Sequence, residues 1–173
     1  MELRPADDQD QGRLRALYVA ARRNEFAQAG LDAVAVQALL ALQYEAQSLA
    51  YRQQFPDAQQ YLLLQRQDAV GYLWLQRAPR VLRLLDISLL PDWRGQGLGS
   101  ACLRQLQAQA RAARLTLLLH VAEGNPARRL YERLGFTAGM QRGLHLEMSW
   151  HAERGESPSP SPRTVHPDWR PAP

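Results

Sequence analysis

The chain has 173 residues, 46% of them hydrophobic and 22% charged, a composition typical of one globular domain that buries its core without disulfides or metal. Its net charge of +4 rests on arginine alone, and the absence of lysine excludes a phosphate-loop lysine, a Schiff-base lysine and a lysine general base. Cys102 is the single cysteine, and we find neither a signal-peptide pattern nor an apolar run of about 20 residues, so we expect a cytoplasmic protein.

Two helices are predicted in the first third of the chain. A short strand over 1–6 comes first, and a helix over 7–23 follows, with an acidic start, a basic end and apolar residues at helical spacing. After a loop, a second helix is predicted over 33–54, because Pro56 limits its extension. Four leucines are expected near one side of it: Leu39, Leu40, Leu42 and Leu49.

Strands follow the second helix. Residues 60–66 and 69–77 are rich in strand-forming residues and flank a short polar turn, which predicts a hairpin. A third strand over 80–90 ends at Pro91, because proline has no N–H to donate to a ladder.

The second half of the chain predicts a parallel crossover. Apolar residues recur every four positions over 97–114, which indicates a helix, and 115–121 is almost continuously apolar, as in a strand covered on both faces. Strand, helix and strand over 81–121 therefore form a right-handed parallel unit.

A last helix is predicted to start at Asn125 and Pro126 and to end at Gly135. Its inner face comprises Ala127, Leu130, Tyr131 and Leu134. A strand pair completes the domain, which we assign to residues 1–150. Residues 151–173 are rich in Pro, Ser and Arg and are expected to form a disordered tail.

Three glycines at alternate positions mark the junction between the third strand and the following helix, in "LLPDWRGQGLGSACL" over 89–103. A helix start presents free N–H groups and a positive dipole, and missing Cβ atoms let phosphate oxygens reach those groups. The pattern is not a dinucleotide fingerprint, because Ser100 stands where a third glycine is needed, and it contains no phosphate-loop lysine.

The segment "LLDISLLPDWRGQGLGSACL" resembles the acyl-CoA pyrophosphate motif of the GNAT acetyltransferase superfamily, and "LLLHVAEGNPARRLYERLGF" resembles its second motif. The similarity extends over roughly residues 2–150. It implies an α/β (α+β) fold: a mixed, mostly antiparallel sheet with one splayed parallel strand pair and about four flanking helices. Coenzyme A would lie between the splayed strands and pair with the free edge of the strand that ends at Leu89 and Leu90.

The resemblance also implies roles for individual residues. The pyrophosphate would be held by the segment from Arg94 to Gly99: Arg94, Gly95, Gln96, Gly97, Leu98 and Gly99. The N–H of Leu89 or Leu90 would stabilise the oxyanion, and Tyr131 would protonate the leaving thiolate. Asn125 would cap its helix and contact the pantetheine or the attacking group.

Asp86 lies in an apolar strand, on the same face as Ser88, where an unpaired carboxylate would be costly to bury. One hypothesis gives it a salt bridge to an arginine, such as Arg83 or one on a flanking helix. The other makes it a catalytic base or an anchor for a cationic amine. His120 is a further candidate base, with a structural role as its alternative.

Arg128 lies in the first turn of the last helix, where a cation opposes the helix dipole, so it is a candidate ligand of the coenzyme's 3′-phosphate or else a solvated charge. Cys102 faces the apolar stripe of its helix and is expected in the core. We expect no metal site.

These observations predict an N-acetyltransferase that transfers an acetyl group from acetyl-CoA to an amine directly in a ternary complex. The alternative is a non-catalytic acyl-CoA-binding module with the same cleft. The acceptor is an amine on a small molecule or a protein. We expect no membrane partner, and no nucleic-acid partner because the arginines are dispersed among acidic residues; a homodimer is left open.

Overall fold

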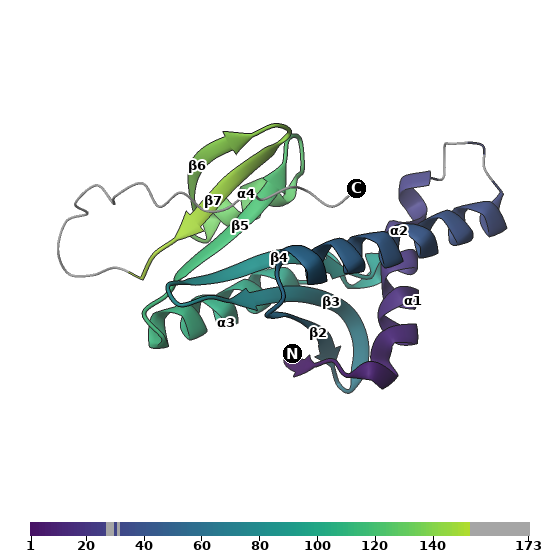
Figure 1. Cartoon of the computed structure of the whole chain (residues 1–173), viewed down its shortest axis with the longest axis horizontal. Coiled ribbons are helices and arrows are strands. Elements are labelled where there is room, and N and C mark those ends of the chain that lie inside the picture. The colour runs from purple at the N-terminus through teal and green to yellow at the C-terminus, as the bar shows by residue number, and fades with distance from the viewer. Residues whose placement is uncertain (27–29, 31, 153–173) are drawn as a thin grey trace.

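The computed structural model describes residues 1–26, 30 and 32–152 (Figure 1). Its strands form a seven-stranded sheet in the order β1-β2-β3-β4-β5-β7-β6. The strands are β1 (Glu2–Pro5), β2 (Ala58–Gln65), β3 (Asp68–Arg77), β4 (Val81–Leu89), β5 (Thr116–Ala122), β6 (Thr137–Arg142) and β7 (His145–Trp150). Of the pairs in this described sheet, only β4 and β5 are parallel, which confirms the mixed, mostly antiparallel arrangement.

The helices are α1 (Gln11–Arg22), α2 (Ala33–Gln54), α3 (Leu98–Ala112) and α4 (Ala127–Arg133), with 3-10 turns η1 (Asp8–Asp10), η2 (Arg23–Phe26) and η3 (Pro91–Trp93). The first predicted helix was too long, because Asp7 caps the separate turn η1 by accepting the Gln9 N–H at 2.9 Å. The second has the predicted bounds, and Asp32 caps it through the N–H groups of Val34 and Ala35.

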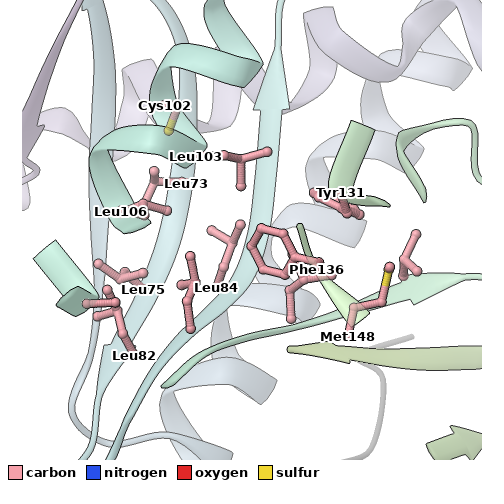
Figure 2. Close-up of a cluster of buried hydrophobic side chains, with 14 of the residues drawn as sticks. Leu73, Leu75, Leu82, Leu84, Cys102, Leu103, Leu106, Tyr131, Phe136 and Met148 are labelled. Atoms are coloured by element: carbon pink, nitrogen blue, oxygen red, sulfur yellow. The ribbon is translucent and has the colours of Figure 1, made fainter. Parts of the chain in front are cut away.

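Two hydrophobic clusters cover the two faces of the sheet. On one face, α1 and α2 pack on β2 and β3, through residues that include Leu40, Tyr72 and Trp74. On the other, α3 and α4 pack on β3, β4 and β5, and Figure 2 shows Leu84, Cys102 and Tyr131 in this cluster. Cys102 is fully buried, as predicted.

The predicted inner face of α2 was partly wrong. Leu42 and Leu49 are 69% and 57% exposed, and the buried residues of α2 are instead Val36, Leu40, Tyr44, Ser48 and Tyr51. The leucines alone misled the assignment because two tyrosines and a serine occupy the side that faces the sheet.

The half of the sheet formed by β5, β7 and β6 turns away from the β1–β4 half (Figure 1). The parallel pairing of β4 with β5 extends only from Val81–Thr116 to Leu84–Leu119. Beyond that point the strands separate, as the resemblance implied.

A membrane-spanning helix is not found among the residues that the structure describes. From residue 153 onward the tail predicted to be disordered lies outside the described residues.

Candidate active site

A cleft of about 760 Å³ opens where β4 and β5 separate. Its lining brings together segments that are far apart in the sequence. One wall comes from α1 and α2 and includes Arg22 and Tyr51, and the other comes from β5 and α4 and includes His120 and Tyr131. Asp86, Leu89, Arg94, Gly99 and Asn125 also line it, so much of the predicted site is assembled in one place.

A β-bulge in β4 sets the direction of Asp86. Trp74 of β3 pairs with Asp86 but the next residue, Leu75, pairs with Leu84, so Leu85 is the extra residue of the bulge. Strict alternation from Leu84 would place Asp86 on the α3–α4 face. The bulge instead places it opposite Trp74, on the α1–α2 face.

The bulge is also held by a side chain from α2. The Tyr51 hydroxyl donates to the Leu85 carbonyl at 3.2 Å. Burial raises the pKa of Tyr51 above its usual value, so this donor keeps its proton.

The free edge of β4 is formed by Ile87 and Leu89. Leu90 donates its N–H to the Val70 carbonyl at 2.9 Å, and alternate residues of an antiparallel strand direct their backbone groups to opposite edges. Ile87 and Leu89 therefore direct theirs toward the cleft, beyond the last β4–β5 pair. The expected role of Leu90 as an N–H donor is wrong, because that N–H is bonded within the sheet.

The glycine turn leaves space beside the N-terminus of α3. Gly95 and Gly97 have φ angles of +72° and +81°, in the left-handed region that favours glycine. A Cβ at either position would have no heavy atom within 4 Å, whereas a Cβ at Gly99 would lie 3.5 Å from the Leu130 side chain. Two of the three glycines thus form an open cradle, and the third allows α3 to approach α4.

Two side chains of the glycine turn hold it in place by donating hydrogen bonds to backbone carbonyls. Arg94 donates to the carbonyls of Leu89 at 2.9 Å and Ala21 at 2.6 Å, and Gln96 donates to Asp92 O at 2.6 Å. Leu98 packs against the α3–α4 cluster. The guanidinium of Arg94 therefore ties the turn to β4 and α1, which leaves the backbone amides as the main groups available to an anion.

Asp86 belongs to a polar network on the α1–α2 face. Its Oδ2 accepts the Tyr72 hydroxyl at 2.9 Å and lies 3.4 Å from Arg22 Nη2, while Arg22 Nη1 donates to the Tyr72 oxygen at 2.7 Å. Burial opposes the charge of Arg22, but Asp86 and the tyrosines outweigh it and raise the pKa of the guanidinium. The salt-bridge hypothesis for Asp86 is confirmed, with an arginine from a flanking helix as its partner.

Arg22 and Tyr72 are not among the site residues predicted from the sequence. Tyr72 alternates with Trp74 along β3, so a correct register for β4 would have found it. Arg22 gives no sequence signal beyond its position in the last turn of α1.

Tyr131 reaches the cleft from the opposite face of the sheet. It is 7% exposed, packs against Phe136 with ring centroids 5.8 Å apart, and lies in the α3–α4 cluster (Figure 2). Burial, with a smaller contribution from Asp86, raises the pKa of its hydroxyl to about 12. Among the described residues, this hydroxyl has no hydrogen-bond partner.

Two further predicted residues have local partners. Asn125 Oδ1 accepts the Ala127 N–H at 2.9 Å, which confirms its capping role. Arg128 donates to Glu132 at 2.8 Å on the exposed side of α4, and the structure does not bring it into the cleft lining. No group of three or more potential metal ligands occurs in the described part of the chain.

Comparison with known proteins gives a consistent result. A sequence model described as "Acetyltransferase (GNAT) family" matches residues 31–136. Mycothiol acetyltransferase of Corynebacterium glutamicum is 31% identical over 86 residues, 48% of this chain and 30% of that protein. The [ribosomal protein bS18]-alanine N-acetyltransferase of Haemophilus influenzae is 35% identical over 75 residues, 43% of this chain and 51% of that protein. The matches thus cover between about a third and a half of these relatives' lengths.

The fold comparison covers more of the chain. The crystal structure of PaiA N-acetyltransferase from Thermoplasma acidophilum in complex with coenzyme A has a TM-score of 0.67. The alignment covers 87% of this chain and 98% of that one at 16% sequence identity, and it shows a shared fold.

Proposed function

The chain belongs to the acetyltransferase (GNAT) family, and from this premise we propose that it transfers the acetyl group of acetyl-CoA directly to an amine within a ternary complex. One observation carries the proposal. The cleft contains an unpaired strand edge and a buried tyrosine, and Arg94 and Gly99 of the glycine turn also line it; a strand edge, amides at a helix N-terminus and a proton donor suit the binding and reaction of a coenzyme A thioester.

The donor would lie along the free edge of β4. The backbone groups of Ile87 can pair with the amides of pantetheine as an added strand does. Its pyrophosphate would bind the amides at Gly95 to Gly99, supported by the dipole of α3. Arg94 holds this turn in place and adds positive charge beside it.

Three groups would assist the acyl transfer. The Leu89 N–H would donate to the oxyanion of the tetrahedral intermediate. Tyr131, kept protonated by its raised pKa, would donate its proton to the departing thiolate. Asp86 accepts the Tyr72 hydroxyl and pairs with Arg22, and these contacts suit an anchor for an ammonium group better than a base.

The acceptor that we propose is an amine on a small molecule or on a protein. One relative's name specifies a protein alanine and the other's specifies mycothiol, so both protein and small-molecule acceptors are candidates. We would therefore test an amino acid, a polyamine, an aminoglycoside, benzylamine, an arylamine and an alanine-starting peptide, with thiol release as the readout. Saturable, amine-dependent thiol release is expected. Binding of acetyl-CoA without transfer to any of these amines would favour the non-catalytic binding module.

A further inference from the structure

The ionic side chains that line the cleft are unevenly paired. Two guanidiniums and three carboxylates line it: Arg22, Arg94, Glu25, Asp86 and Glu123. Both guanidiniums donate hydrogen bonds within the protein, and Asp86 pairs with the first of them at 3.4 Å. Within the described part of the chain, the carboxylates of Glu25 and Glu123 take part in no hydrogen bond or ion pair. The cleft therefore has two carboxylates that are open to a ligand.

A tyrosine hydroxyl marks the reacting end of this cleft. Tyr131 is 7% exposed and lines the cleft, and its hydroxyl has no partner among the described residues. A polar group on a side chain this deeply buried normally has a hydrogen-bond partner, so the hydroxyl points to a bound ligand. Asp86 is, after burial, the next contributor to the raised pKa of Tyr131, so the two side chains lie within electrostatic range of each other.

Glu25 lies further along the α1–α2 wall of the cleft. It belongs to η2, which continues from the last turn of α1, where Arg22 packs over the Tyr18 ring at 3.9 Å. Burial raises the pKa of Tyr18, Arg22 opposes this effect, and Asp86 and Glu25 add to it, so both carboxylates lie within electrostatic range of this ring. Of the two, only Asp86 contributes to the pKa of Tyr131. The order outward from the reacting hydroxyl is therefore Asp86 and then Glu25.

This order of charges suits a ligand with two positive groups. Asp86 is balanced in part by Arg22, whereas Glu25 has no cationic partner among the described residues. The whole chain has a net charge of +4, so the surplus of carboxylates is local to the cleft. A cleft lined by charges of one sign concentrates ligands of the opposite sign. The pyrophosphate of acetyl-CoA is itself negative, so only the acceptor can supply the positive groups.

We propose that the acceptor is a diamine or polyamine, with its reacting amine at Asp86 and a second ammonium at Glu25, an inference that rests on the proposed acetyl transfer. The reacting ammonium loses one proton to solvent and one to the sulfur by way of Tyr131, as the C–N bond forms and the C–S bond breaks. The products are a neutral amide and the thiol of coenzyme A. The acetylated diamine keeps one ammonium, so it matches only one of the two carboxylates and is acetylated again more slowly.

The test compares three acceptors of equal chain length that share one primary amine and differ in the group at the other end. Diaminobutane has an ammonium there, aminobutanol a neutral hydroxyl and aminobutyrate a carboxylate. We expect kcat/KM to fall in that order, with diaminobutane about fivefold above aminobutanol after correction for its two equivalent amines. Added salt should reduce this difference, because Glu25 is exposed and its charge is screened.

The ratio of kcat/KM for diaminobutane to that for aminobutanol is then measured for three variants. Glu25→Gln should lower the ratio about fivefold. Glu123→Gln should keep most of it, because Glu123 follows β5 on the other wall, and the control Glu45→Gln should keep all of it. Glu45 contacts Arg15 at 4.0 Å and does not line the cleft. A ratio cancels any loss of folded enzyme, so a folding defect does not produce the expected change.

Two results would overturn the inference alone: a parent chain that acetylates aminobutanol as efficiently as diaminobutane, or a Glu25→Gln variant whose ratio equals the parent's. Transfer only to amines without a second positive group, such as the arylamine, would also overturn it and leave the proposed function intact. A parent chain that transfers acetyl to no amine would instead contradict the proposed function and the inference with it.

Discussion

Replacing Tyr131 with phenylalanine separates packing from chemistry at the proposed acid. The ring, which packs on Phe136 at 5.8 Å between centroids, is kept, and only the hydroxyl is removed. This hydroxyl has no hydrogen-bond partner among the described residues, so the unfolding free energy should change by less than about 1 kcal/mol. Loss of the acid should lower kcat by about 10²-fold or more, with acetyl-CoA affinity near that of the parent.

A matched control is available in the other cluster. Tyr44 is 2% exposed, outside the cleft lining, and its hydroxyl contacts Gln60 Nε2 at 3.2 Å and Gln11 Oε1 at 3.3 Å. Tyr44→Phe should therefore cost about 1 kcal/mol of stability and leave kcat unchanged. The two variants are compared by urea denaturation, acetyl-CoA titration and steady-state kinetics. If Tyr131→Phe retains the parent's kcat while chemistry limits turnover, Tyr131 is not the acid.

Three further predictions address the donor site, His120 and the tail. Gly97→Val should abolish the rise in melting temperature that acetyl-CoA causes, whereas Gly143→Val, also at a positive φ (+57°) but in the β6–β7 turn, should keep it; binding by the first variant would refute the phosphate role of the glycine turn. Because the folded pKa of His120 is lowered from 6.5 to about 4, the unfolded chain takes up the proton first as the pH falls. Stability should therefore drop between pH 6.5 and 4 by up to about 1.4 kcal/mol per pH unit, and His120→Gln should lessen the drop in urea titrations. A chain ending at residue 152 should retain the kcat of the full chain, and a large loss would give the tail a catalytic role.

Much of the fold could be predicted because its local signals agree with its tertiary structure. The bounds of α2, the stop of β4 before Pro91 and the inner face of α4 follow from periodicity and from residues that cannot continue an element. The buried face of α2 could not be predicted from its leucines, because Tyr44 and Tyr51 point inward to bond polar groups of the sheet region.

The site residues that belong to a sequence motif could be predicted. Those that only the tertiary structure brings to the site could not. Arg94, Gly99 and Tyr131 are motif residues and line the cleft, whereas Gly95 and Gly97 lie outside its lining. Ile87 and Arg22 depend on a bulge and a flanking helix that the sequence does not encode locally. Arg128 was predicted to be a phosphate ligand because its position opposes the helix dipole, but in the structure it forms an ion pair with Glu132.

Direct acetyl transfer in a ternary complex is tested by initial rates measured while acetyl-CoA and the amine are both varied. Direct transfer should give double-reciprocal lines that intersect, with one acetylated amine formed for each thiol released. Parallel lines would indicate a covalent acetyl-enzyme, and thiol release without acetylated amine would indicate hydrolysis; either result would exclude direct acetyl transfer to the amine.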